Sequence, residues 1–304
     1  MKRLFTFGCS YTSYSWPTWA DLLSVDFEYS ENWGLAGVGN RGIAERIAES
    51  NVRNKFNSND TVIVQWSSHL RNDFWHPFSL PERPGTWKTS GSIFNYINEP
   101  LYDQWWLDNF FSEEGYLMHT LNNIVLVQEL LKASGATWYM TSMGDVRNIG
   151  ADLVDNGWGA EDVLLTDDDK GKAFVAWEKF PQYKIYDKSI WLENSEHWLT
   201  PLNTFAYNTS EPLYDFIDTT NETVIYQDPH PTVKHYAMWV ESVLKNKLNI
   251  SEENISKMHN IANITEEVHQ KFKFDKRLFE TMLATREEYV RGTMPNWPFR
   301  LAGF

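Results

Sequence analysis

The sequence has little cysteine, an excess of acidic over basic residues, and no long apolar run. Its single cysteine, Cys9, excludes an internal disulfide framework. The 27 basic and 41 acidic residues give a net charge of −14 with no offsetting basic patch, which argues against nucleic acid or an anionic membrane as partner. The apolar stretch after Lys2 and Arg3 is too short for a secretion signal or a membrane span. We expect neither, which leaves the localisation open with the cytoplasm as default.

Predicted strands and helices alternate along the 304 residues, without repeats or long low-complexity tracts. We predict strands over residues 4–7, 27–33, 61–66, 137–143 and 224–226, and helices over residues 16–23, 41–50, 119–133 and 232–248. Such alternation is typical of a doubly wound α/β fold, in which helices cover both faces of a parallel sheet. Sites in this class lie at the C-terminal ends of the strands.

Two long insertions and a tail fall outside these elements. The insertions, residues 72–115 and 144–221, are rich in aromatic side chains, and the tail, residues 249–304, is helical and charged. We therefore divide the chain into an α/β domain over residues 1–248 and a helical appendage that packs on the core or mediates assembly into an oligomer. The first insertion leaves the sheet directly after the third strand, so we expect it to roof the site.

The first predicted strand ends in a turn that carries hydroxyl groups. Residues 8–12 read Gly-Cys-Ser-Tyr-Thr, and glycine permits a sharp turn with close approach of other groups. This pattern places Ser10 where a nucleophile belongs in a parallel α/β sheet. Alternatively, Ser10 and Thr12 simply cap the helix that follows.

The last predicted strand, residues 224–226, is followed at once by Asp228 and His230. Pro231 suits the first turn of the next helix and fixes where the imidazole lies. Two strand ends more than two hundred residues apart thus supply a serine and an Asp/His pair, the components of an activated nucleophile.

These residues resemble the SGNH/GDSL hydrolase family, which has a nucleophilic serine near its N-terminus and an Asp/His motif before its final helix. The resemblance implies Ser10 as nucleophile, His230 as base and Asp228 as its partner, with Cys9 where the family usually has aspartate. Residues 32–37, Asn-Trp-Gly-Leu-Ala-Gly, match the second family motif. By that match, the N–H groups of Gly37 and Ser10 form an oxyanion hole. The other interpretation of these glycines is a plain flexible turn.

The third motif of the family, Gly-x-Asn-Asp, is not matched. After the strand at residues 61–66, Ser67 stands at the glycine position and His69 at the asparagine position. The side-chain donor to the oxyanion is therefore open among Ser67, Ser68, His69 and Asn72, and position favours Ser68 or His69. If none serves, the two backbone donors remain.

The last motif departs as well. The family usually spaces aspartate three residues before histidine, whereas Asp228 lies two before His230. A spacing of two occurs in polysaccharide O-acetyltransferases related to this family, so a triad remains compatible with the sequence. Asp145, after the strand at residues 137–143, is the alternative carboxylate.

Tryptophan is abundant, with 15 residues, and its flat face and N–H suit contact with sugar rings and hydroxyls. Trp16, Trp19 and Trp239 have core-helix spacing. The candidates for substrate contact all lie in the first insertion: Trp75, Trp87, Trp105 and Trp106.

The sequence thus predicts a serine esterase for short-chain acyl esters, such as O-acetyl groups on carbohydrate. Neither a metal nor another cofactor is expected, because His69, His76, His230 and His235 lack the spacing of a zinc site. An O-acyltransferase with the same residues, or a non-catalytic carbohydrate-binding or structural protein of the same fold, is the alternative.

Overall fold

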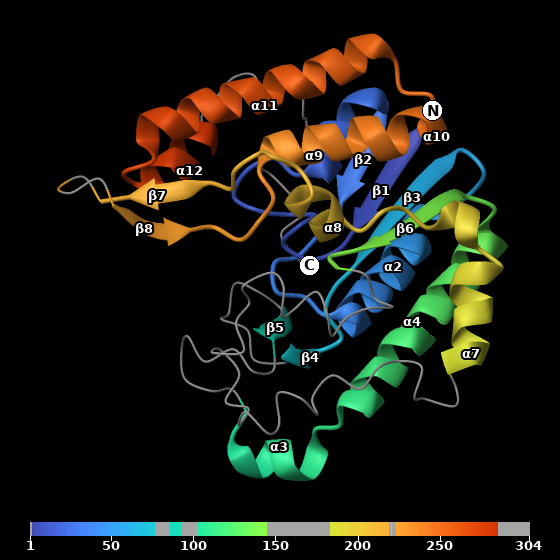
Figure 1. The fold of residues 1–304 in the computed structure, drawn as a ribbon. Coiled ribbons are helices and arrows are strands. Elements are labelled where there is room, and N and C mark those ends of the chain that lie inside the picture. Colours follow the sequence, from blue (N-terminus) through green and yellow to red (C-terminus); the bar gives the residue numbers. More distant parts are fainter. Residues whose placement is uncertain are drawn as a thin grey trace.

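The computed structural model describes residues 2–76, 86–92, 102–144, 183–218, 220 and 223–284. Within these residues, the centre of the α/β fold is a four-stranded parallel sheet in the order β2-β1-β3-β6 (Figure 1). Its strands are β1 (Arg3–Phe7), β2 (Tyr29–Asn32), β3 (Asp60–Trp66) and β6 (Thr137–Ser142). Every residue of β3 is buried, as expected of a central parallel strand. The strand order is compatible with a flavodoxin-like fold.

Helices cover both faces of this sheet, and the main ones lie where the apolar pattern predicts them. They are α1 (Trp19–Leu23), α2 (Asn40–Asn54), α4 (Glu113–Ser134) and α9 (Val233–Trp239), the last continued by the π-helical segment η5 (Val240–Leu244) and by α10 (Lys245–Leu248). Figure 1 shows α2 and α4 together on one side of the sheet and α9 on the other. Gly135 ends α4 with a φ of 74°, a left-handed conformation that favours glycine.

Shorter elements lie around this core. They are η1 (Ser24–Asp26), the antiparallel pair β4 (Arg71–His76) and β5 (Thr86–Ser92), α3 (Gln104–Phe110), α7 (Tyr183–Tyr186), η3 (Asp187–Leu192), η4 (Ser195–His197), α8 (Leu202–Tyr207), and the antiparallel pair β7 (Asp215–Ile217) and β8 (Val224–Gln227). No helix of the described ranges is long and apolar enough to cross a bilayer.

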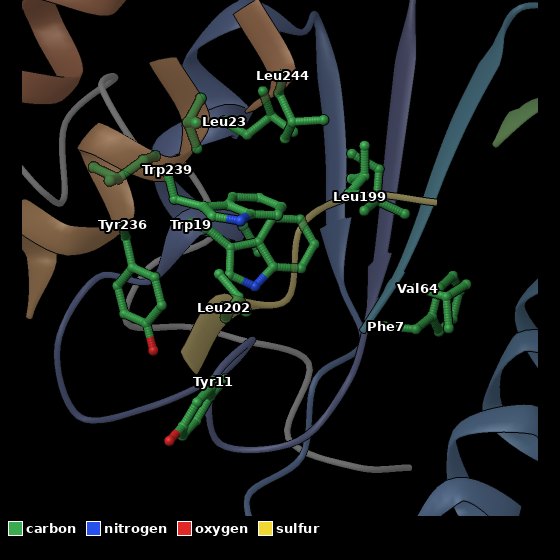
Figure 2. Packing of buried hydrophobic residues seen from close by; sticks show 14 of the residues in the cluster. Phe7, Tyr11, Trp19, Leu23, Val64, Leu199, Leu202, Tyr236, Trp239 and Leu244 are labelled. Carbon is green, nitrogen blue, oxygen red and sulfur yellow. The ribbon is translucent and has the colours of Figure 1, made fainter. Parts of the chain in front are cut away.

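Tryptophans fill the core between the sheet and α9. The rings of Trp19 and Trp239 are 5.7 Å apart at 60°, and Figure 2 shows them side by side with Leu202 beneath and Leu23 above. Both rings and Trp16 are fully buried. The prediction that these three tryptophans are structural is therefore confirmed.

The strand predicted at residues 224–226 forms, but it does not belong to the parallel sheet. β8 forms where it is expected, but it pairs with β7 in a separate antiparallel hairpin, and all four of its residues are exposed. The position next to β6 is occupied by Trp198, which forms an isolated parallel bridge with Met140. Asp228 and His230 therefore reach the site from outside the parallel sheet.

The C-terminal segment contributes two helices, α11 (Glu252–Phe272) and α12 (Lys276–Ala284). Figure 1 shows α11 lying over α9, and its buried residues Ile255, Met258 and Ile261 belong to the same hydrophobic cluster as the sheet. In α12, Phe279 is fully buried. The described part of this segment packs on the core.

The packing of Trp19 predicts a large difference between two tryptophan substitutions. Trp19→Ala removes a side chain with no exposed surface and should lower the free energy of unfolding by about 3–5 kcal/mol. Trp105→Ala removes a ring that is 64% exposed and should change it by less than about 0.5 kcal/mol. Urea unfolding monitored by circular dichroism measures both, and equal losses would contradict this core.

Candidate active site

Ser10 lies in a tight turn directly after β1. The carbonyl oxygen of Cys9 accepts hydrogen bonds from the N–H groups of Thr12 and Ser13, at 2.9 and 3.1 Å. Gly8 permits this turn, because a Cβ there would lie 2.2 Å from the Thr12 hydroxyl oxygen. Oε1 of Gln65 also accepts from the Cys9 N–H at 3.3 Å, which ties the turn to β3. The Ser10 side chain is thus held by its backbone, with 6% of the residue exposed.

His230 lies between Ser10 and Asp228. Its Nδ1 is 2.6 Å from Oδ1 of Asp228, and its Nε2 is 2.9 Å from the Ser10 hydroxyl oxygen. Because a carboxylate only accepts hydrogen bonds, Nδ1 carries the proton, and Nε2 is left to accept from the serine hydroxyl. The geometry thus places an acceptor nitrogen within hydrogen-bond distance of the hydroxyl it would deprotonate.

The segment that carries His230 is fixed to the serine turn, although β8 is outside the parallel sheet. Nε1 of Trp16 donates to the carbonyl oxygen of Pro231 at 3.1 Å, and the hydroxyl of Tyr11 donates to that of Pro229 at 3.4 Å. The His230 ring stacks on Tyr14, with ring centroids 3.8 Å apart and an angle of 21°. Aromatic residues of the loop after β1 therefore position the imidazole from two sides.

Asp228 has no exposed surface, and both of its carboxylate oxygens are used. Oδ1 accepts from the N–H of His230 at 3.0 Å in addition to Nδ1. Oδ2 accepts from the Tyr14 hydroxyl at 2.8 Å, from the Tyr226 hydroxyl at 3.3 Å and from Nζ of Lys276 at 2.8 Å. Burial alone would raise the pKa of this carboxyl, but the bonds and charges of His230 and Lys276 outweigh it and hold the pKa below its ordinary range.

The pKa of His230 is lowered from its ordinary value of 6.5. Burial is the main cause, since it disfavours the charged imidazolium, and the charges of Arg71 and Lys276 act in the same direction. The bond to Asp228 opposes them without cancelling them. The imidazole is therefore neutral at neutral pH, the state in which it accepts a proton.

The loop after β2 runs beside the serine turn. Trp33 donates its N–H to the carbonyl oxygen of Thr6 at 2.8 Å, and Leu35 donates to that of Gly8 at 2.9 Å. Gly37 follows with a φ of 79°. Within the described part of the chain, the N–H groups of Ser10 and Gly37 have no acceptor. Both N–H groups therefore keep a proton to donate.

In the segment after β3, Ser68 keeps a hydroxyl proton to donate, so the third donor stays open between Ser68 and His69. The Ser67 N–H is bonded to Oδ1 of Asn40 at 2.7 Å, and the Ser68 hydroxyl oxygen accepts from the Leu70 N–H at 3.1 Å. Asn72 donates its amide to the Tyr102 hydroxyl at 3.0 Å. His69 is buried, and its role stays a prediction.

Gly39 and Gly42 allow a buried carboxylate to approach α2. The N–H of Gly39 donates to both oxygens of Asp73 at 2.9 Å, and the N–H of Gly42 donates to Oδ2 at 3.0 Å. A Cβ on either glycine would come within about 3 Å of that carboxylate. These two glycines therefore have a structural role that sequence reasoning missed.

The predicted substrate-contacting tryptophans are only partly described. The backbones of Trp75 and Trp87 lie opposite each other in β4 and β5, but their side chains are outside the described residues. Trp105 is exposed, and the Trp106 ring packs 4.3 Å from Tyr102. Figure 1 places their helix, α3, beyond β4 and β5 and away from the end of β1. Asp145, the alternative carboxylate, also lies outside the described residues.

Three polar residues that hold the site together were not predicted from the sequence. Tyr14 and Lys276 bind the carboxylate of Asp228, and Asn40 binds both the N–H and the carbonyl oxygen of Ser67. Only the position of Tyr14, four residues after Ser10, gave a local signal. Asn40 and Lys276 approach from helices that start far from their partners in the sequence.

Comparison of the chain with protein-family models, curated proteins and solved structures finds no match. Among the described residues, no cluster of three or more His, Cys, Asp or Glu side chains could hold a metal ion.

The environment of His230 predicts a titration below that of an ordinary histidine. Because burial disfavours the imidazolium, the folded protein should keep His230 neutral until the pH falls below 6.5. Histidine ring proton shifts followed by NMR between pH 4.5 and 8.5 measure this, with the signal assigned from its loss in His230→Gln. A midpoint above 6.5 would contradict the described burial.

Proposed function

We propose that this protein is a serine esterase of the SGNH/GDSL type, which hydrolyses short-chain acyl esters through an acyl-Ser10 intermediate. The observation that supports this most is the continuous chain of hydrogen bonds from Ser10 through His230 to Asp228. Such a chain is the arrangement by which a serine hydroxyl is made nucleophilic.

In the first half of the reaction, the Ser10 hydroxyl oxygen attacks the ester carbonyl carbon while Nε2 of His230 takes its proton. The carbonyl oxygen becomes an oxyanion, to which the N–H groups of Ser10 and Gly37 donate. Asp228 stabilises the imidazolium that has formed. The bond to the leaving alkoxy oxygen then breaks, and that oxygen takes the proton from His230. An alcohol leaves, and the acyl group stays on Ser10.

In the second half, a water molecule attacks the acyl carbon and gives a proton to Nε2 of His230. The bond between the acyl group and Ser10 breaks, and the proton returns to the serine oxygen. The acid leaves and the starting state is restored. Every proton in this cycle moves through His230, and no cofactor takes part.

The SGNH/GDSL type is supported by how the matching motifs come together. The turn after β1, the loop after β2 and the segment before α9 are the three parts that carry the family's serine, glycine and Asp/His residues. The doubly wound order of the sheet agrees with the proposal. The hairpin position of β8 and the divergent segment after β3 are departures from it, so two backbone N–H groups carry the oxyanion in our account.

The proposed substrate is a small acyl ester, such as an O-acetyl group on carbohydrate. Ser10 is 6% exposed, and Tyr11, Tyr14 and Trp16 pack around His230. We take the burial of Ser10 and these aromatic neighbours to favour a short acyl chain over a fatty acyl chain. The proposal that this ester is carried by a carbohydrate rests on the tryptophan content of the chain.

The proposal predicts the ranking of three substitutions in p-nitrophenyl acetate hydrolysis. Ser10→Ala and His230→Ala should remove the enzymatic rate, because they delete the nucleophile and the base that contacts it. Asp228→Asn should lower kcat on the order of 10³–10⁴-fold, since the amide favours the wrong imidazole tautomer. Thr12→Ser, a hydroxyl change in the same turn, is the control. Near wild-type activity in Ser10→Ala would overturn the assignment.

A second prediction concerns the ester itself. If access to Ser10 is narrow, kcat/KM should fall steadily from acetyl to butyryl to octanoyl p-nitrophenyl esters, and acetylated oligosaccharides should release acetate. A preference for octanoyl esters would contradict the short-chain proposal.

Adding a free sugar as acceptor distinguishes an esterase from an O-acyltransferase, because transfer of the acetyl group to that sugar in place of water would indicate an O-acyltransferase.

A further inference from the structure

The aspartate of the proposed triad is reached by a residue from the C-terminal segment. Nζ of Lys276, the first residue of α12, lies 2.8 Å from Oδ2 of Asp228. We infer that Lys276 is a positioning residue for the esterase reaction. Its ammonium group holds the Asp228 carboxylate in place and adds a positive charge to the surroundings of His230. This inference rests on the proposed function, and it makes a helix outside the sheet part of the active site.

The two oxygens of Asp228 have separate tasks. Among the described residues, Oδ1 accepts only from the N–H and Nδ1 of His230, whereas Oδ2 accepts from Lys276 and from the hydroxyls of Tyr14 and Tyr226. A buried carboxylate is costly unless its charge is paired and its lone pairs are bonded. Lys276 supplies the only full positive charge on the Oδ2 side among the described residues. With it in place, Oδ1 stays directed at the imidazole.

Lys276 is held in position by the packing of α12. Three residues further along the helix, on the same face, Phe279 is fully buried, and its ring lies 6.1 Å from Trp16 and 5.7 Å from Tyr214. The Nζ atom also lies 4.9 Å from the centre of the Tyr226 ring. Trp16 in turn donates to Pro231 beside His230. Trp16 therefore contacts both Phe279, which packs α12 on the core, and the backbone beside His230.

The charge of Lys276 has a second consequence, which a purely structural lysine would not have. It lowers the pKa of His230, together with burial and with Arg71 at the start of β4. Among the described residues, the other titratable groups around this cluster are the hydroxyls of Tyr11, Tyr14, Tyr226 and Tyr236, and Glu280 on α12, 3.9 Å from Lys276. Loss of the ammonium should therefore raise the pKa of His230, because the negative charge of Asp228 beside the imidazole is then no longer offset.

The test compares Lys276→Met with Lys276→Arg and with Arg277→Met. Arg277 is exposed on the same helix, so its variant removes the same charge one residue away. In p-nitrophenyl acetate hydrolysis, Lys276→Met should lose about 10- to 100-fold in kcat with little change in KM, because the triad is misoriented. Lys276→Arg should recover most of that loss, and Arg277→Met should match wild type. Lys276→Gln replaces the methionine variant if the latter does not fold.

The second measurement is the acidic limb of the pH–rate profile, together with the NMR titration of His230. Both midpoints should move to higher pH in Lys276→Met, return in Lys276→Arg and stay fixed in Arg277→Met. Unchanged midpoints, or equal effects of the two methionine variants, would overturn the inference. If wild-type protein hydrolyses no ester, the proposed function fails, while the NMR titration still decides whether Lys276 acts on the Asp228–His230 pair.

Discussion

The hydrogen bond between Asp228 and His230 depends on a carboxylate that has no exposed surface. Such a group is stable only where several donors converge on it. Those donors come from the loop after β1, from β8 and from α12, so the loop, the hairpin and the C-terminal helix must all be in place before the imidazole is oriented. These three elements outside the sheet therefore supply the donors that the buried charge of Asp228 requires.

The sheet and its helices were predictable because burial leaves a local pattern. The apolar run that becomes β3 and the heptad-like pattern of α4 are each readable within their own residues. The sheet position of β8 was not readable in this way. Its apolar residues look like those of a core strand, yet they are exposed in a hairpin, because Trp198 has taken the place beside β6. The choice of partner depends on contacts far along the chain.

The candidate site shows the same division. Ser10, Asp228 and His230 lie in short motifs, and in the structure hydrogen bonds connect their three side chains. Lys276 is the first residue of α12, with the basic residues Lys273 and Arg277 close by in the sequence, and its pairing with Asp228 spans 48 residues. Nothing in its neighbourhood separates it from Lys273 or Arg277. Residues such as Lys276, whose contacts form only in the folded structure, therefore could not be identified from local sequence patterns.

The central claim is that Ser10 is an activated nucleophile, and covalent labelling tests it most directly. A fluorophosphonate should add once to the protein, and peptide mass spectrometry should place the adduct on Ser10. His230→Ala should lose the label while keeping its fold, because the serine would no longer have a base to take its proton. A well-folded wild-type protein that stays unlabelled, or that is labelled equally without His230, would contradict the account.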